Sequence, residues 1–202
     1  MRTSIYSVHP GIAMVQRAIA DLPARTGRSL EQWIALIKTQ GPRDEASRRQ
    51  WLKKSHELGT NYAGWLAKAA DGRGETGDPD SYLETAERCV EAMFAGAKAP
   101  MRPIYDALLT RALSIGPDVK ACPGKTIVPL YRAHVFAQIK PSTRTRIDLG
   151  LALKNTRTPA RLINTGGLKK GDRITHRIEV TSLADIDEDL MRWLERAHDM
   201  DR

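Results

Sequence analysis

Apolar side chains recur every three or four positions through the first 72 residues, which is the spacing of amphipathic helices. The clearest start is at Ser29, where Gln32 completes a capping-box pattern ahead of an apolar face over residues 30–37. We predict four helices in this stretch. The others cover about residues 11–21, stopped by Pro23; residues 44–59, capped by Asp44 and ended by Gly59; and a fourth through Tyr62, Trp65 and Leu66.

A polar segment at residues 71–78, DGRGETGD, separates these helices from the rest of the chain. It holds three glycines and no apolar side chain, so it offers nothing to bury. We therefore expect a helical module with its linker at residues 1–77 and a second, basic domain at residues 78–202. In the second domain, Asp78 and Pro79 form a strong helix start, and helices are predicted to about residue 95 and over residues 103–115.

After residue 116 the apolar period changes from that of a helix to two, which predicts strands with one buried side. Alternation is clear over residues 134–140, 147–154 and 174–181, and a further strand at residues 127–131 contains Pro129, which is typical of an edge or a bulge. An amphipathic helix over about residues 183–198, capped by Ser182, closes the chain. The predicted fold class is α+β, with a small helical module followed by an antiparallel sheet packed with helices.

The charge of the chain is concentrated in one part of the second domain. The formal net charge is +8, and residues 120–177 hold thirteen Lys and Arg against two Asp, a net charge of +11 for this basic stretch. A field of this sign attracts phosphates, nucleic acid or other acidic partners. The alternative is a solvated basic surface that the acidic helices on either side neutralise.

Composition indicates a folded protein with no special cofactor. The chain is 41% hydrophobic and 28% charged, it has no apolar run of about eighteen residues, and its first residues lack the pattern of a secretory signal. We expect a cytoplasmic protein that does not contact a membrane. Cys89 and Cys122 are too few for a disulfide framework, so we interpret them as unpaired thiols, and the spacing of the histidines predicts no metal site.

Two short motifs resemble phosphate-binding and calcium-binding loops, but the residues around them do not fit either kind of site. Residues 123–126, PGKT, resemble the end of a phosphate-binding loop, but Val119 stands where its first glycine belongs and a strand follows where a helix is needed. The acids at residues 185–189 resemble the start of a calcium loop, but Leu190 occupies the position that requires glycine. His176 falls on the apolar side of its strand, where a hydrogen-bonded core histidine is the expected role.

The polar side of the predicted sheet carries the candidate site. Cations there can clamp a phosphate or a carboxylate, and an aromatic ring can stack on a base. The alternative is a solvent-facing side with cross-strand ion pairs. Asp148 and Glu179 are the acids in this field, and each is a candidate general base or an ion-pair partner of an arginine. The candidate ligand-binding residues are Tyr131, Arg132, Phe136, Gln138, Lys140, Arg146, Lys154 and Arg177.

Three classes of function remain open on these observations. The leading one is a non-enzymatic module that binds an anionic ligand, with nucleic acid ahead of a small molecule, and needs no cofactor. The second is an enzyme that acts on a small anionic substrate, with Asp148 or Glu179 as the base. The third is an adaptor that docks a protein partner through residues 1–77.

Two parts of the sequence resemble known families. The segments TGRSLEQWIALIK and WLKKSHELGTNYAGWLA resemble the bacterial domain of unknown function numbered 4287, a short helical module, over roughly residues 10–70. From about residue 91 the chain is similar to the domain numbered 5655, most clearly in GPDVKACPGKTIVPLYRAHVFAQIKPSTRTRIDLGLAL and ITHRIEVTSLADIDEDLMRWLERAH. This second type is distantly similar to YdhG-like proteins and resembles a tail of some nuclease-like or transport proteins. The resemblance supports the two-part division and implies an α+β second domain, it gives no catalytic residues to carry over, and it adds some weight to nucleic acid as the ligand by analogy.

Overall fold

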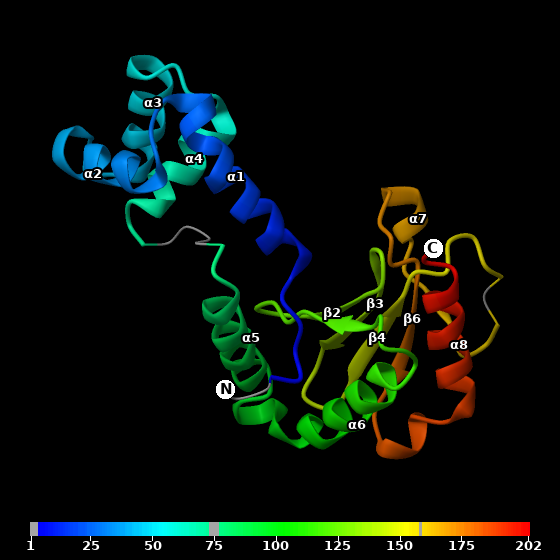
Figure 1. The fold of residues 1–202 in the computed structure, drawn as a ribbon. Helices are drawn as coiled ribbons and strands as arrows, with labels where there is room; N and C mark the ends of the chain where they lie inside the picture. The colour runs from blue at the N-terminus through cyan, green and yellow to red at the C-terminus, as the bar shows by residue number, and fades with distance from the viewer. Residues whose placement is uncertain (1–3, 73–76, 158) are drawn as a thin grey trace. The chain divides into compact units, whose positions relative to one another are not determined.

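The computed structural model describes residues 4–72, 77–157 and 159–202, and its backbone forms two compact units (Figure 1). One is a helical unit, His9–Tyr82. The second unit consists of residues 4–8 together with Leu83–Arg202. The division therefore falls slightly later in the chain than the boundary that we placed after residue 77, and residues 4–8 pack with the second unit.

The helical unit contains α1 (Pro10–Thr26), α2 (Leu30–Gln40), α3 (Glu45–Ser55) and α4 (Thr60–Ala69). Its core is built around Trp33, Ile37, Leu52 and Leu66, which are all almost fully buried. The predicted capping box is present, because Gln32 N–H donates to Ser29 Oγ at 3.3 Å and Ser29 N–H donates to Gln32 Oε1 at 2.8 Å. The apolar period thus identified all four helices.

Two helix ends differ from their prediction. Pro23 lies inside α1, because a proline in the last turn removes only one backbone hydrogen bond, and the helix ends instead at Gly27, which has φ 76° and donates its N–H to the carbonyl of Pro23 at 2.8 Å. Gly59 does not end α3. The chain leaves that helix through Glu57, with φ 54°, and Gly59 is the N-cap of α4.

The helices of the second unit are α5 (Pro79–Met93), whose first turn belongs to the helical unit, the 3₁₀ turn η1 (Gly96–Met101), α6 (Arg102–Leu113), α7 (Gly167–Lys170), the 3₁₀ turn η2 (Leu183–Asp185) and α8 (Glu188–Asp199). Asp78 caps α5 as predicted, since its Oδ2 accepts from Ser81 N–H at 3.0 Å. The closing helix is divided, however. Ser182 caps η2, whereas Asp187 caps α8 by accepting from Leu190 N–H at 2.9 Å.

The sheet has six antiparallel strands in the order β1-β2-β3-β4-β6-β5. Their bounds are β1 (Lys120–Ala121), β2 (Val128–Tyr131), β3 (Val135–Pro141), β4 (Ile147–Leu151), β5 (Ile163–Asn164) and β6 (His176–Val180). The strand containing Pro129 is second from the edge, and the pairing register shifts next to this proline, between Leu130 and Tyr131. The α+β fold is confirmed.

One side of the sheet is covered by helices. Ile147, Leu149 and Leu151 of β4 are fully buried, and they belong to one cluster with Leu108 of α6 and Leu194 of α8, the two helices that Figure 1 shows beside the sheet. The other side of the sheet carries the polar positions. The alternation in the sequence is therefore explained by burial on a single side.

Candidate anion-binding site

The strand register brings most of the predicted polar residues together. Lys140 lies opposite Asp148, and Asp148 lies opposite Glu179. Two residues farther along each strand, on the same side of the sheet, Gln138 and Arg177 both lie opposite Gly150. A central region of the polar side is thus formed by β3, β4 and β6.

Two arginines and two acids on this side form an ion-pair network. Arg177 Nη1 donates to Asp148 Oδ1 at 2.8 Å and to Glu179 Oε1 at 2.7 Å. Arg146 Nε lies 3.0 Å from Asp148 Oδ1, and its Nη1 lies 3.0 Å from Glu179 Oε1. Ser142 Oγ completes the network by donating to Asp148 Oδ2 at 2.5 Å. The positive charges of Arg146 and Arg177 are therefore balanced within the sheet.

Burial and charge oppose each other at Arg177. Its partial burial acts to lower the pKa of the guanidinium, but the hydrogen bond to Glu179 and the negative charge of Asp148 outweigh this effect, so the pKa is raised. Arg177 consequently keeps its charge and its partners. This arrangement is typical of a structural cross-strand pair.

Phe136 is not on the polar side, and this expectation was wrong. Its side chain is fully buried, and its ring packs edge-on against His198 of α8 with 5.3 Å between the ring centroids. The alternation of β3 breaks at this point, because Phe136 and Ala137 are both buried. Phe136 is a core residue and is not available to stack on a base.

Arg132 also leaves the predicted group. It lies in the turn after β2, where its Nε donates to Asp118 Oδ2 at 2.8 Å and its Nη1 donates to the backbone oxygen of His198 at 3.1 Å. The hydrogen bond from His198, together with that from Arg132, lowers the pKa of Asp118. Arg132 therefore holds the end of α8.

The remaining two candidates lie at the margins of the sheet. Tyr131 ends β2 and is partly buried, and this burial raises the pKa of its phenol. Lys154 follows β4 with φ 52° and lines a small cavity of about 110 Å³ together with Asp172 and Arg173. Neither residue belongs to the central part of the polar side.

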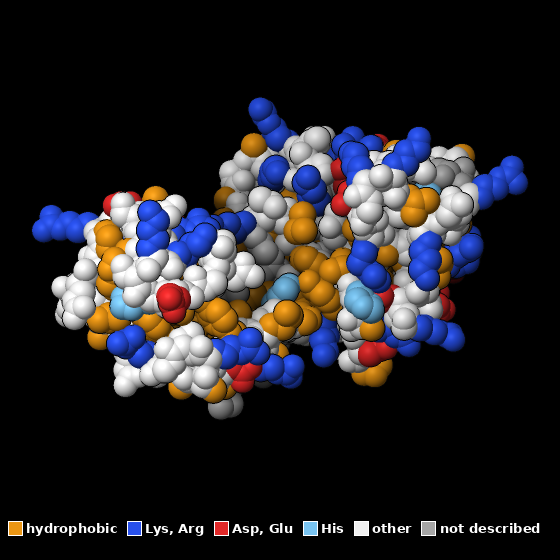
Figure 2. Space-filling view, turned by 90° about the horizontal axis from the view of Figure 1, so that it is seen from above, with side chains coloured by type: hydrophobic (Ala, Val, Ile, Leu, Met, Phe, Trp, Pro, Cys, Tyr) orange, Lys and Arg blue, Asp and Glu red, His pale blue; other side chains and the backbone are white. Residues whose placement is uncertain are grey.

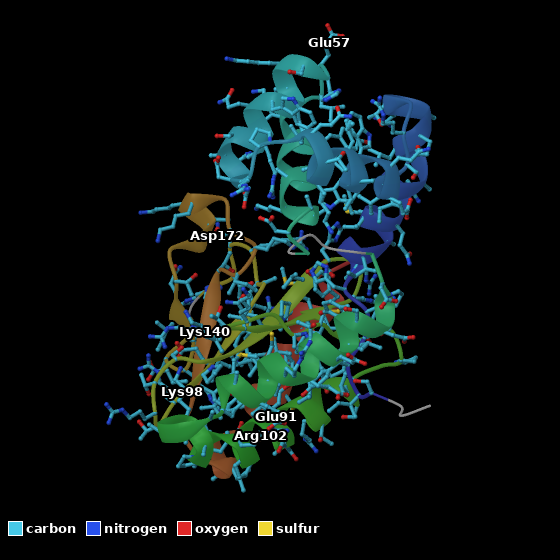
Figure 3. The ribbon with its side chains drawn as sticks, turned by 90° about the vertical axis from the view of Figure 1, so that its left-hand side faces the viewer. Glu57, Glu91, Lys98, Arg102, Lys140 and Asp172 are labelled. Carbon is cyan, nitrogen blue, oxygen red and sulfur yellow. The ribbon has the colours of Figure 1, made fainter. Side chains whose placement is uncertain are left out.

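A group of cations without an ion pair to any acid in the described part of the chain lies beside this network. Lys98, Lys125, Lys140 and Arg144 line a cavity of about 500 Å³, which we call the basic hollow. Its other lining residues are the hydroxyl-bearing Thr126 and Ser142 and the apolar Ala92, Met93, Ala95, Ala97 and Pro141. Figure 3 labels Lys98 and Lys140, which lie along the same side of the second unit.

Separate segments of the chain form the basic hollow. Lys98 comes from η1, Lys125 from the loop between β1 and β2, Lys140 from β3, and Arg144 from the turn between β3 and β4. Lys98 Nζ donates to the backbone oxygen of Pro141 at 2.6 Å, which fixes its ammonium group against the end of β3. The turn holding Arg144 is closed by Ser142 N–H, which donates to the Arg146 oxygen at 3.0 Å.

The charge of the basic hollow is uncompensated. Among the described residues, no ion pair within 4.0 Å involves any of its four cations, and no carboxylate lines it. In contrast, Arg102, Arg161 and Arg173 each pair with at least one acid. A concave group of free cations concentrates the positive field and attracts anions.

The sequence pointed to only part of this group. Lys140 is one of the predicted residues, and Lys125 and Arg144 lie in the basic stretch. Lys98 was missed, because it lies outside the basic stretch and in a short 3₁₀ turn without a helical pattern. On the face drawn in Figure 2, Lys and Arg side chains are also scattered widely, so surface charge alone does not define the site.

Other chemistry is sparse in the part of the chain that the structure covers. No group of three or more His, Cys, Asp or Glu side chains there is placed to hold a metal ion. Cys122 is buried, and this burial raises the pKa of its thiol to about 11. His176 is almost fully buried, and burial lowers its pKa, which agrees with a core histidine. None of the helices within these ranges is long and apolar enough to cross a bilayer.

Comparison with known proteins identifies two families. The model of the domain of unknown function DUF5655 matches residues 90–201, and that of the domain of unknown function DUF4287 matches residues 14–72. No curated protein and no solved structure matches the chain. The larger match covers more than half of the chain and contains the whole sheet and the basic hollow. The chain therefore belongs to the DUF5655 family and carries a DUF4287 domain before it.

Proposed function

We propose that the second unit is a non-enzymatic module that binds an anionic ligand, and that this ligand is nucleic acid. The observation that carries the proposal is the basic hollow, where four cations face one cavity without a carboxylate among the described lining residues. Phosphate groups that enter such a field release condensed counterions, which drives association. The formal net charge of +8 adds long-range attraction to the same partner.

The polar side of the sheet supports the binding role less directly. Arg146 and Arg177 share Asp148 and Glu179, so they contribute little net charge to a ligand. The same pairing occupies both carboxylates with arginine, which favours a structural role over that of a general base. For this reason we place the ligand at the basic hollow and not over the network.

A titration of short labelled DNA and RNA, single-stranded and double-stranded, tests the proposal. Fluorescence polarisation is measured with the full chain at about 50 and 200 mM salt, where several phosphate contacts change the affinity by orders of magnitude. We expect binding that weakens steeply with salt. Affinity that does not respond to salt, or no binding at the lower salt, would contradict the proposal.

The site is tested with matched variants. Lys125→Gln and Lys140→Gln together remove two cations of the basic hollow, and Lys169→Gln with Lys170→Gln remove two exposed cations of α7 outside it. Both pairs change the net charge by the same amount. We expect the first pair to lose more affinity than the second, and equal losses would show that overall charge, not the hollow, holds the ligand.

A further inference from the structure

The cations of the basic hollow converge on one volume. They are supplied by η1, by the loop before β2 and by the hairpin of β3 and β4, and they surround a cavity of about 500 Å³. A surface that binds the backbone of a duplex would instead present cations spaced along a line. The volume of this cavity is within the range of small-ligand pockets, about 300–1,000 Å³.

The amount of charge indicates the kind of phosphate. An internal phosphodiester carries one negative charge, whereas a phosphomonoester carries about 1.5 to 2 at neutral pH. Four uncompensated cations around one cavity therefore match the terminal group better than a single internal linkage. Lys98 also keeps donor capacity, because an ammonium has three protons and its interaction with the Pro141 oxygen uses one.

The walls that position these cations are held by the fold. Lys98 is tied to β3, and Lys140 sits in the paired part of β3 opposite Asp148. Gly124 N–H donates to the Ile127 oxygen at 2.9 Å and closes the loop that carries Lys125. The backbone at these cations is therefore fixed before an anion binds, which limits the conformational entropy that binding costs.

The apolar part of the lining indicates what accompanies the phosphate. Ala92, Ala95, Ala97, Met93 and Pro141 offer small apolar surfaces, on which a sugar or a base can lie in van der Waals contact. Of the described residues, none that lines the basic hollow is Asn, Gln, Asp or Glu, the types that read adenine and cytosine edges. Lys and Arg can also contact guanine, but here the four cations are assigned to the phosphate, so recognition should depend weakly on base identity.

We propose that the basic hollow is a binding site for a phosphomonoester at the end of a single nucleic-acid strand, with no strong preference for sequence. This inference rests on the proposed function and specifies it. A free nucleoside monophosphate presents the same chemistry, and the experiment separates the two sources.

The test compares identical labelled 12-nucleotide single strands that carry a 5′-phosphate, a 3′-phosphate or hydroxyls at both ends, with the label placed internally. Polarisation is measured with the full chain. We expect at least one phosphorylated strand to bind about tenfold more tightly than the hydroxyl strand, which corresponds to about 1.4 kcal/mol. Lys125→Gln with Lys140→Gln should abolish this ratio, whereas Lys169→Gln with Lys170→Gln should preserve it.

Conservative variants and thermal melts guard against a folding artefact. Lys140→Arg keeps the charge and should keep the preference, and each variant should melt within a few degrees of the unchanged protein. Binding of an unlabelled nucleoside monophosphate, measured by calorimetry against the parent nucleoside, identifies the free-nucleotide source.

The outcomes distinguish this inference from the proposed function. Equal, salt-sensitive binding of all three strands would overturn the assignment of the hollow to a terminal phosphate, but it would still support nucleic-acid binding. If the monophosphate binds and none of the strands does, the ligand is a free phosphomonoester. This result would overturn both nucleic-acid binding and the assignment to a strand end. If the Lys125→Gln, Lys140→Gln variant still prefers the phosphorylated strand, the phosphate binds elsewhere and the inference is overturned.

Discussion

Removing Lys125 and Lys140 should change the salt dependence of binding, whereas removing Arg146 and Arg177 should not. For a single strand, each phosphate contact contributes about 0.7 to the slope of log affinity against log salt. If the four cations of the basic hollow together neutralise four phosphate charges, two on the terminal phosphate and two on the neighbouring linkages of the strand, the slope is about −2.8, and affinity falls about fifty-fold between 50 and 200 mM salt. With Lys125→Gln and Lys140→Gln the slope becomes about −1.4, and the same change of salt costs about sevenfold.

The arginine pair provides the contrast because its charges are already matched. Arg146→Gln with Arg177→Gln leaves Asp148 and Glu179 unpaired, so affinity should fall by general repulsion while the wild-type number of phosphate contacts, and hence most of the slope, remains. The measurement is a polarisation titration at four or more salt concentrations for each protein. A slope that drops equally for both pairs, or that stays unchanged for the lysine pair, would refute the assignment of the ligand to the basic hollow.

Three further predictions concern stability. Arg177→Ala should destabilise the second unit by about 1–3 kcal/mol, because two partly buried acids lose a shared partner. Arg192→Ala, whose side chain is 66% exposed, should destabilise it by less than about 0.5 kcal/mol. Both free energies are measured by denaturant unfolding, followed through hydrogen exchange of the β4 amides. Asp201→Ala should lower the melting temperature more than Asp199→Ala, because the Asp201 side chain is 2% exposed and the Asp199 side chain is 67% exposed; equal shifts would contradict this. Burial lowers the pKa of His56, so the neutral form is favoured in the fold, and the stability of the helical unit should fall as pH drops below about 6.5 toward the lowered value. His56→Gln should flatten that dependence in a tryptophan-fluorescence unfolding series, and an unchanged pH profile would show that His56 is not responsible.

Local rules were sufficient for most of the elements. The capping box at Ser29, the cap at Asp78 and the period-two alternation of β6 are each decided by a few neighbouring residues, and each appears in the structure as predicted. Short-range backbone hydrogen bonds and one-sided burial act over one or two turns or a few strand positions, so they can be deduced from sequence alone. The α+β class followed from these elements.

Helix ends and single positions were less predictable, because a competing local signal or tertiary packing can override a local preference. Pro23 stays within α1, since the loss of one backbone bond in the last turn is tolerated. Phe136 breaks the alternation of β3, because its ring is buried edge-on against the His198 ring of α8. The end of α1 has a local signal in Gly27, whereas the burial of Phe136 has none among the neighbouring residues.

The sequence by itself determined that the second domain is strongly basic and that its cations gather between residues 120 and 177. It could not determine which of them are free. Only the strand register places Arg146 and Arg177 against Asp148 and Glu179, and only the tertiary structure brings Lys98 from η1 to Lys125, Lys140 and Arg144. The physical reason is that net charge adds along the chain, whereas neutralisation depends on distances of 3–4 Å between side chains far apart in sequence.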